Sequence, residues 1–126
     1  MEMTAKPRGR KLVDLFHALA MKAESGVDVK ILVNVRADLP HVPASNAYAV
    51  QMLRQRNIEI RQPRLGRVCH AKVIIADDCK AIIGSHNLSV KSCHSNFEIS
   101  VLLTDKRTLD VLVPFFLHTF SKSHPI

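Results

Sequence analysis

At 126 residues, 47% of them hydrophobic and 23% charged, the chain is long enough for one hydrophobic core and too short for two independent domains. Its 18 lysines and arginines exceed its 11 aspartates and glutamates, and the net charge of +7 favours a polyanionic partner, nucleic acid before anionic lipid. Three cysteines without Cys-x-x-Cys spacing disfavour a disulfide scaffold, and the absence of a signal-like start or an 18-residue apolar run predicts a cytoplasmic protein without stable membrane association.

The N-terminal half is predicted to contain two helices and two strands. Residues 1–10 are polar and basic, and we expect a flexible lead-in ahead of a single domain at 11–126. Apolar residues recur at helical spacing over 11–24. Alternating apolar and polar residues predict a strand over 27–36, and the two prolines of 37–44 predict a loop.

The next segment predicts a helix over 45–56, with Ser45 as its cap, and a short strand over 58–61. Strands are then expected over 68–76 and 80–84, joined by a tight turn at residues 77–79. Residues 73–76 are apolar on both faces of their strand, which predicts burial within a sheet.

A further strand is expected over 97–103, followed by a terminal helix that starts near Asp105. Pro114 is expected to kink or split this helix, because proline removes a helix hydrogen bond. The helix carries four apolar residues on one side: Leu109, Leu112, Phe116 and Phe120. This order of helices and strands predicts an α/β sandwich.

The most informative pattern is His-x-Lys-x4-Asp-x6-Gly-Ser-x-Asn, formed by His70, Lys72, Asp77, Gly84, Ser85 and Asn87. On a strand, side chains two residues apart share a face, so an imidazole and an ammonium group are expected side by side. Glycine allows close approach of a ligand, and the serine hydroxyl and asparagine amide can donate to phosphate oxygens. Taken singly, the histidine could be an ordinary core residue and the Gly-Ser-x-Asn stretch an ordinary turn. Their joint occurrence favours phosphodiester chemistry.

The pattern resembles the HKD motif of the phospholipase D superfamily, and the continuation through Asn96 and Glu98 is similar to that of its small endonuclease-like members. The likeness covers roughly residues 11–122. It implies a central mixed β-sheet flanked by helices. It also implies a strand–helix segment ahead of residue 11 that is missing or truncated here.

The resemblance further implies a homodimer, because two such motifs meet in the family and this chain has one. His70 of one subunit would form a phosphohistidine, and His70 of the partner subunit would act as general acid and base. Lys72, Ser85 and Asn87 would bind the phosphate, and Glu98 would orient His70. Asp77 is counted as catalytic in the family, although strand alternation points it away from the phosphate and favours a role in the turn. No metal or other cofactor is expected.

Arginines cluster before the motif, and those closest to it, Arg61, Arg64 and Arg67, are candidates for contacts with a nucleic-acid backbone. A solvated helix end and loop is the alternative for the cluster. The leading hypothesis is a metal-independent, sequence-nonspecific endonuclease acting on DNA or RNA. The alternatives are a phospholipid phosphodiesterase or phosphatidyltransferase, and a catalytically idle nucleic-acid-binding remnant.

Overall fold

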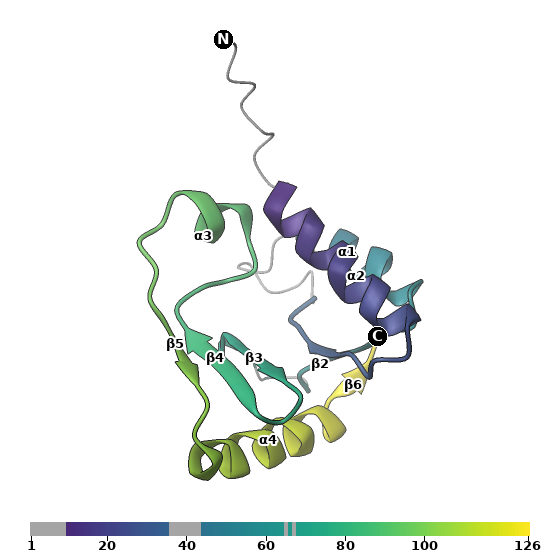
Figure 1. Cartoon of the computed structure of the whole chain (residues 1–126). Coiled ribbons are helices and arrows are strands. Elements are labelled where there is room, and N and C mark those ends of the chain that lie inside the picture. The colour runs from purple at the N-terminus through teal and green to yellow at the C-terminus, as the bar shows by residue number, and fades with distance from the viewer. Residues whose placement is uncertain (1–9, 36–43, 65, 67) are drawn as a thin grey trace.

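The computed structural model describes residues 10–35, 44–64, 66 and 68–126 (Figure 1). In chain order its elements are α1 (Arg10–Glu24), β1 (Lys30–Leu32), α2 (Ala44–Arg54), β2 (Glu59–Gln62), β3 (Val73–Ala76), β4 (Lys80–Gly84), α3 (Val90–His94), β5 (Ser100–Leu103), α4 (Lys106–Ser121) and β6 (His124–Pro125). The predicted α/β class is confirmed.

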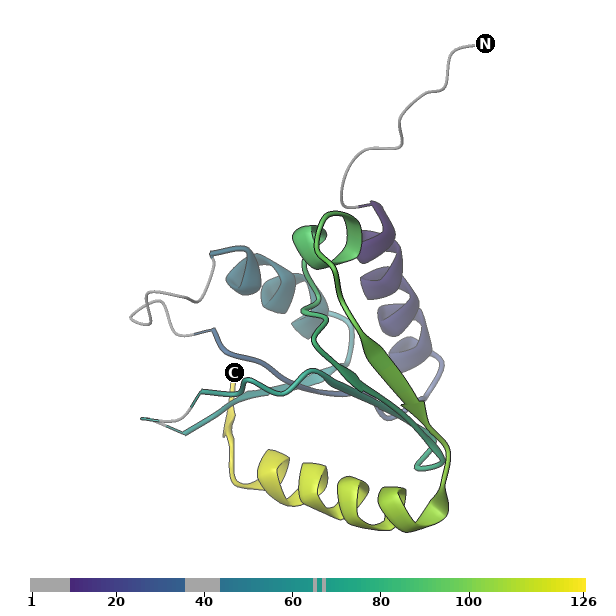
Figure 2. The same ribbon diagram turned by 90° about the vertical axis from the view of Figure 1, so that its left-hand side faces the viewer.

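The strands form two three-stranded sheets instead of the single central sheet that we expected. In the first sheet β1 pairs in parallel with β2, and β2 pairs antiparallel with β6, so this sheet is mixed. In the second sheet β3, β4 and β5 form an antiparallel meander. Figure 2 shows α4 on one side of the strands and α1 and α2 on the other.

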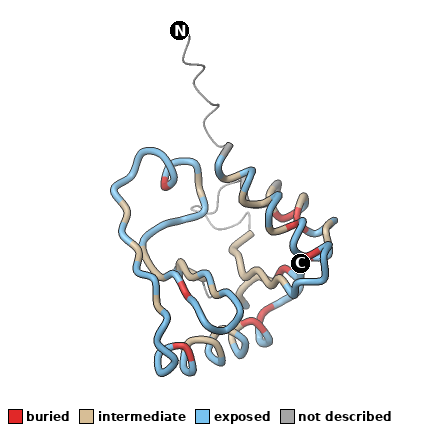
Figure 3. Tube along the Cα trace, in the orientation of Figure 1, coloured by how far each residue is buried: buried red, intermediate tan, exposed pale blue. Residues whose placement is uncertain are grey.

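The main core lies between the first sheet and the two N-terminal helices. Its buried members come from α1, α2, β2 and the residue before β2, and they are Ala23, Val50, Leu53, Ile58 and Ile60. Half-buried apolar side chains of α1 and β1, including Phe16, Leu19 and Ile31, pack against them. Figure 3 shows that buried positions gather here, whereas the segment around α3 is mostly exposed. The helical spacing of apolar residues in α1 therefore predicted the buried face correctly.

The second sheet is covered on one face only. Ile74, Ile82 and Leu102 stand opposite one another on neighbouring strands and are 48%, 43% and 64% exposed. Ala81, whose side chain points to the other face, is 1% exposed. The prediction that β3 is buried on both faces is therefore wrong, because packing covers only the side on which Ala81 lies.

The β3–β4 hairpin has the register that the motif spacing requires. Val73 pairs with Ile83 and Ala76 with Lys80, so the predicted turn at residues 77–79 closes the hairpin. Asp77 and Asp78 have φ angles of 52° and 54°, a left-handed conformation that aspartate tolerates better than most residues. The two aspartates thus account for the tight turn.

The C-terminal helix is one continuous element despite Pro114. Asp105 caps its start by accepting a hydrogen bond from the Thr108 N–H (2.9 Å). Hydrogen bonds from the side chain and the backbone of Thr108 lower the pKa of Asp105. Leu109 and Phe120 are buried, as the apolar spacing predicted. Phe115, which is not part of the predicted apolar row, is 65% exposed.

Element boundaries differ from the predictions mainly in the strands. The strand predicted over 27–36 is reduced to the three residues of β1, and the strand predicted over 68–76 begins only at Val73. Helix α2 begins at Ala44, so Ser45 lies inside it and is not its cap. Helix α3 and strand β6 were not predicted. Residues 1–9 and 36–43, which carry most of the expected lead-in and loop, lie outside the described residues.

Arg61 ties the C-terminal end of α4 to the first sheet. Its Nη1 donates to the backbone oxygens of Phe120 and Ser121 (both 3.3 Å), and its guanidinium lies 4.8 Å from the centre of the Phe120 ring. The same side chain forms an ion pair with Glu59 (2.7 Å). These contacts give the Ser121 oxygen a donor and add a second donor to the Phe120 oxygen, which also accepts from the Ser123 N–H (3.1 Å).

We therefore expect Arg61→Met to lower the free energy of unfolding by about 1–3 kcal/mol, because it leaves helix-end carbonyls without a charged donor. Chemical denaturation measures the change. Arg54→Met, at an exposed position of α2, is the matched control and should change stability by less than about 0.5 kcal/mol. Equal effects of the two substitutions would contradict the anchoring role.

Candidate active site

One open pocket of about 390 Å³ brings most of the predicted motif together. His70 and Lys72 line it from the segment before β3, and Ser85 and Asn87 line it from the loop after β4. Val73, Ile83 and Gly84 complete its floor and walls with Ala71. The two halves of the motif, 12 or more residues apart in sequence, meet because the β3–β4 hairpin returns the chain to its starting edge.

The segment that carries the imidazole, residues 69–72, is extended chain outside the strand and is held at both ends. At one end the Cys69 N–H donates to Asn34 Oδ1 (2.9 Å) and Asn34 Nδ2 donates to the Cys69 oxygen (2.7 Å). At the other end the Gly84 N–H donates to the Lys72 oxygen (3.2 Å). His70 lies between these two anchors and is exposed.

Lys72 is half-buried, and its ammonium donates to the backbone oxygen of His70 (2.6 Å). This bond places the positive charge at the backbone of His70, in the pocket that both residues line. An ammonium has three donors, so the bond leaves capacity to bind an anion in the pocket. Lys72 is thus positioned to attract the phosphate of a diester to His70.

Gly84 is needed for strand packing more than for ligand approach. A Cβ atom at this position would lie 2.6 Å from Ser100 Cα and still closer to the Ile99 oxygen, both backbone atoms of the segment that forms β5. No flexible side chain could move aside to relieve these two contacts. The glycine of the motif therefore lets β5 approach β4 and hold the loop that follows.

Glu98 contacts Ser85 in this structure, and the predicted hydrogen bond from His70 is absent among the described residues. The Ser85 hydroxyl donates to Glu98 Oε2, and Asn96 Nδ2 donates to Oε1 (3.0 Å). These hydrogen bonds, first that of Ser85 and then those of Asn96 and Ser92, lower the pKa of Glu98 from 4.5 to about 2. The carboxylate therefore orders the loop after β4 and reaches the motif through Ser85.

Both donors of Ser85 are engaged in this arrangement. Its N–H donates to the Ile99 oxygen (3.0 Å), and its hydroxyl has a single proton, which goes to Glu98. The predicted phosphate contact of Ser85 would require its hydroxyl to turn away from Glu98. Asn87 is exposed at the edge of the pocket, where its predicted phosphate contact requires no such change.

Asp77 lies away from the pocket. It is exposed in the β3–β4 turn, and three strand steps of about 3.3 Å each separate the pocket residue Val73 from Ala76 beside it. The position agrees with the expected role in the turn. It does not support the family's assignment of this aspartate to the chemistry.

The arginines expected to contact nucleic acid have other partners. Arg61 anchors α4, as described above, and Arg64 Nε donates to the Lys122 oxygen (2.5 Å). Arg67 lies outside the described residues. The contact expected of Arg61 stays a prediction, and its guanidinium would have to leave backbone carbonyls and Glu59 to make that contact.

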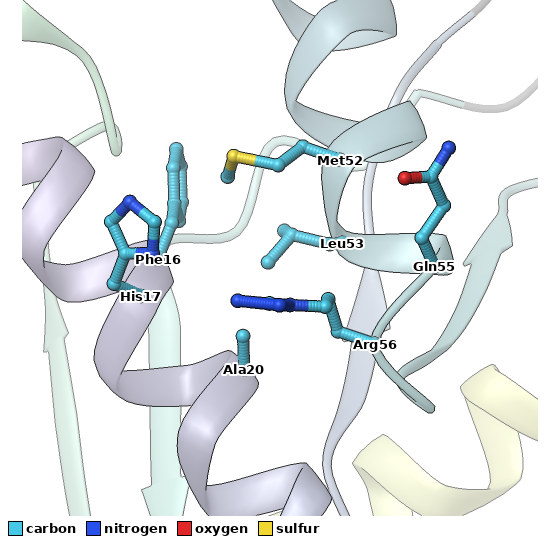
Figure 4. Close-up of a pocket in the computed structure, with 7 residues that line it drawn as sticks. All are labelled: Phe16, His17, Ala20, Met52, Leu53, Gln55 and Arg56. Carbon is cyan, nitrogen blue, oxygen red and sulfur yellow. The ribbon is translucent and has the colours of Figure 1, made fainter.

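A second cavity, of about 190 Å³, lies between α1 and α2 (Figure 4). Phe16, Met52 and Leu53 supply much of its apolar lining, and Arg56 forms an ion pair with Glu24 (3.1 Å). The positive charge of Arg56 is thus already compensated by Glu24.

Across the described residues, no group of three histidine, cysteine, aspartate or glutamate side chains is arranged to hold a metal. No helix in the described part of the chain could cross a membrane.

Sequence reasoning missed Asn34 and the apolar pocket residues Val73 and Ile83. Asn34 follows β1 and precedes Cys69 by 35 positions, and nothing in its neighbourhood resembles a motif. Asn34 occupies a regular polar position of the alternating pattern over 27–36, so nothing in the sequence signals its role. The two apolar residues were assigned to a sheet face, and only the register shows that they end at the pocket.

Residues 10–119 match the protein family described as "Cardiolipin synthase, PLD-like domain". The chain belongs to the PLD-like family. Cardiolipin synthases of Halalkalibacterium halodurans and Geobacillus thermodenitrificans are 33% and 35% identical to it over 114 residues, which is 90% of this chain and 22% of each relative. The chain thus spans about a fifth of the length of these PLD-like relatives.

Solved structures support the PLD-like fold. Nuc from Salmonella typhimurium, a phospholipase D family member, superimposes with a TM-score of 0.77 at 22% identity, covering 90% of this chain and 73% of Nuc. TrmBL2 is an archaeal chromatin protein whose structure shows a novel mode of DNA binding. It superimposes with a TM-score of 0.57 at 19% identity, covering 94% of this chain and 42% of TrmBL2.

The Glu98 network makes a prediction about pH. Because the folded pKa lies below the ordinary value of 4.5, the network stabilises the fold above about pH 4.5, and this stabilisation is lost as the pH falls toward 2. Ser85→Ala removes the largest cause, so the pKa of Glu98 should rise toward 4.5 in an NMR titration of its carboxyl carbon. Ser95→Ala, at an exposed neighbouring position, should leave it near 2. An unchanged titration in Ser85→Ala would contradict the arrangement.

Proposed function

We propose that this chain is a metal-independent phosphodiesterase that cleaves the backbone of DNA or RNA without reading its sequence, through a phosphohistidine on His70. The observation that carries the proposal is the pocket in which His70, Lys72, Ser85 and Asn87 converge. Membership of the PLD-like family supports phosphodiester chemistry. The net charge of +7 supports a polyanionic substrate.

In the first step of the proposed reaction, an imidazole nitrogen of His70 attacks phosphorus. A P–N bond forms, the P–O bond to one side of the diester breaks, and the departing oxygen takes a proton from His70 of the partner subunit. In the second step water attacks phosphorus and gives its proton to that same imidazole. The P–N bond then breaks and returns its electron pair to His70, so both histidines regain their starting states.

Lys72 and Asn87 are assigned to the non-bridging phosphate oxygens, where negative charge increases in the transition state. The bond from Lys72 to the His70 oxygen supports this role, because it holds the ammonium at the backbone of the residue that carries the attacking group. Ser85 joins them when its hydroxyl turns from Glu98 to the phosphate. We assign to Glu98 the ordering of this loop, and it orients His70 only if substrate or a second subunit draws the two together.

A homodimer is part of the proposal because the reaction needs two imidazoles and the motif supplies one per chain. Ile74, Ile82 and Leu102 form an uncovered apolar row on the second sheet. Ile74 is two residues after Lys72 in the chain, and Ile82 is two residues before Gly84 along β4, so the row begins next to the pocket. An apolar surface of this kind beside the pocket supports association with a second copy. Each subunit would then contribute its His70 to one shared site.

Phosphatidyl transfer is the second candidate, and a specific observation favours it. The relatives at 33–35% identity are cardiolipin synthases, whose name denotes phospholipid synthesis. The same pair of steps would serve this reaction if an alcohol replaced water as the second nucleophile. The choice between nucleic acid and lipid therefore depends on what binds beside the pocket, not on the reacting groups.

The substrate test incubates supercoiled plasmid or phosphatidylglycerol vesicles with the protein in EDTA. We expect nicking of the plasmid by the wild type and loss of nicking by about 10³-fold or more in His70→Asn, with DNA retention unchanged. His94→Asn, at an exposed position of α3, is the control and should cut normally. Glycerol release without nicking would replace the proposal by the second candidate. Neither activity, with DNA still retained, would favour an idle nucleic-acid-binding domain.

The dimer is tested by co-expressing two differently tagged subunits and purifying the mixed species. We expect a solution mass of twice 14.1 kDa, and near-complete loss of activity when one subunit carries His70→Asn, because a shared site needs both imidazoles. A mixed species with His94→Asn should keep full activity. Retention of half the activity in the His70→Asn mixture would mean that each subunit works alone.

A further inference from the structure

We propose that Asn34 is a positioning residue that fixes His70 by pairing with the backbone of Cys69. This inference rests on the proposed function of the pocket and adds a residue outside the motif. Asn34 follows β1 in the first sheet, whereas Cys69 opens the segment that leads into β3 in the second. The pairing therefore connects the two sheets at the point where the imidazole is mounted.

The hydrogen bonds between the Asn34 side chain and the Cys69 backbone have the same donor and acceptor pattern as a residue pair in a β-sheet. A primary amide presents one donor and one acceptor, and here both are used on a single residue: Asn34 Oδ1 accepts from the Cys69 N–H (2.9 Å) and Nδ2 donates to the Cys69 oxygen (2.7 Å). Both hydrogen bonds have ordinary lengths. The side chain thus supplies to residue 69 the two backbone partners that a neighbouring strand would supply.

Asn34 is itself held firmly. The N–H of the preceding residue, Val33, donates to the Arg61 oxygen (3.0 Å), which continues the β1–β2 pairing beyond Leu32. Asn34 and Cys69 are both half-buried. The His70 segment is therefore fixed relative to β2, whose Ile60 is buried in the main core.

The need for such an anchor follows from the strand boundaries. Regular pairing in the second sheet begins at Val73, and the bond between the Gly84 N–H and the Lys72 oxygen extends it by one residue. His70 lies two residues beyond that bond, and in an extended chain this is enough freedom to move its ring by more than an ångström. The contact at Cys69 fixes the other side of His70.

Asn34 does not line the pocket, so its effect on the reaction is exerted through the position of His70. Displacement of an attacking group by about 1 Å can cost roughly 100-fold in rate. The backbone of Lys72 is held by its own bond from the Gly84 N–H, and Asn87 lies in the loop after β4, so we expect phosphate binding to change much less than the position of His70. Loss of the contact between Asn34 and Cys69 is therefore expected to lower kcat and to leave KM nearly unchanged.

The test compares Asn34→Asp, Asn34→Gln and Asn57→Asp with the wild type. Aspartate keeps the acceptor for the Cys69 N–H but sets an oxygen against the Cys69 oxygen, so we expect kcat to fall by about 10- to 100-fold with KM within about twofold. Glutamine keeps both groups on a longer arm and should recover part of the loss. Asn57→Asp, an identical chemical change in the turn after α2, should leave kcat within about twofold, because its φ of 60° suits both residues.

A second readout, hydrogen exchange of the Cys69 amide followed by NMR, is independent of activity. We expect the Cys69 amide to be protected in the wild type and to exchange at least about tenfold faster in Asn34→Leu, which removes the acceptor Oδ1. Wild-type kcat in Asn34→Asp, or a kcat loss that only tracks the loss of folded protein, would overturn the positioning role. A wild type inactive on every diester would overturn the proposed function and the positioning role in it, while the exchange rate would still report whether Asn34 holds residue 69.

Discussion

The candidate site depends on the register of one hairpin. Val73 stands opposite Ile83, and the pairing continues outward until the Gly84 N–H meets the Lys72 oxygen. The turn that sets this register uses two consecutive left-handed aspartates, one of which is the aspartate of the motif. A slip by one residue would send every side chain of the strand to the opposite face and separate the imidazole and ammonium from the loop after β4. The spacing of the motif residues therefore reflects the geometry of the hairpin as well as the chemistry of the site.

The parts of this arrangement that were predictable from the sequence are those encoded locally. The hairpin turn, the bounds of β4 and the buried face of α1 follow from short-range patterns, and the grouping of His70 with Lys72, Ser85 and Asn87 follows from the motif. The division into two sheets was not predictable, because apolar alternation over 27–36 and 68–76 gives no sign of where pairing stops. The exposed face of the second sheet was missed for the same reason, since apolar strands look alike whether or not a layer covers them.

Long-range polar contacts account for the remaining differences between the expected and the observed side-chain partners. Arg61 belongs to a basic cluster in sequence, yet its guanidinium serves α4 through carbonyl groups some sixty positions away. Glu98 was expected beside the imidazole, but it forms its hydrogen bonds with Ser85 and Asn96. In both cases the residue type predicted a polar interaction but not its partner. The partner depends on how helices and strands pack together, which the sequence separation does not reveal.

The reacting groups and the substrate-selecting surface are separate questions in this protein. In the proposed reaction the groups of the pocket attack a phosphodiester, and the same groups would serve nucleic acid or lipid. Net positive charge favours the former and the sequence relatives favour the latter. Both alternatives pass through the same covalent state on the same imidazole.

The most direct measurement is therefore capture of that covalent state. Protein mixed with a diester substrate, quenched at alkaline pH to preserve a P–N bond and digested, would be mapped by mass spectrometry. The account predicts a phosphoryl-linked group on the peptide that contains His70, formed during turnover and missing from His70→Asn. Turnover with no adduct on His70, or with the adduct on another residue such as His86, would contradict it.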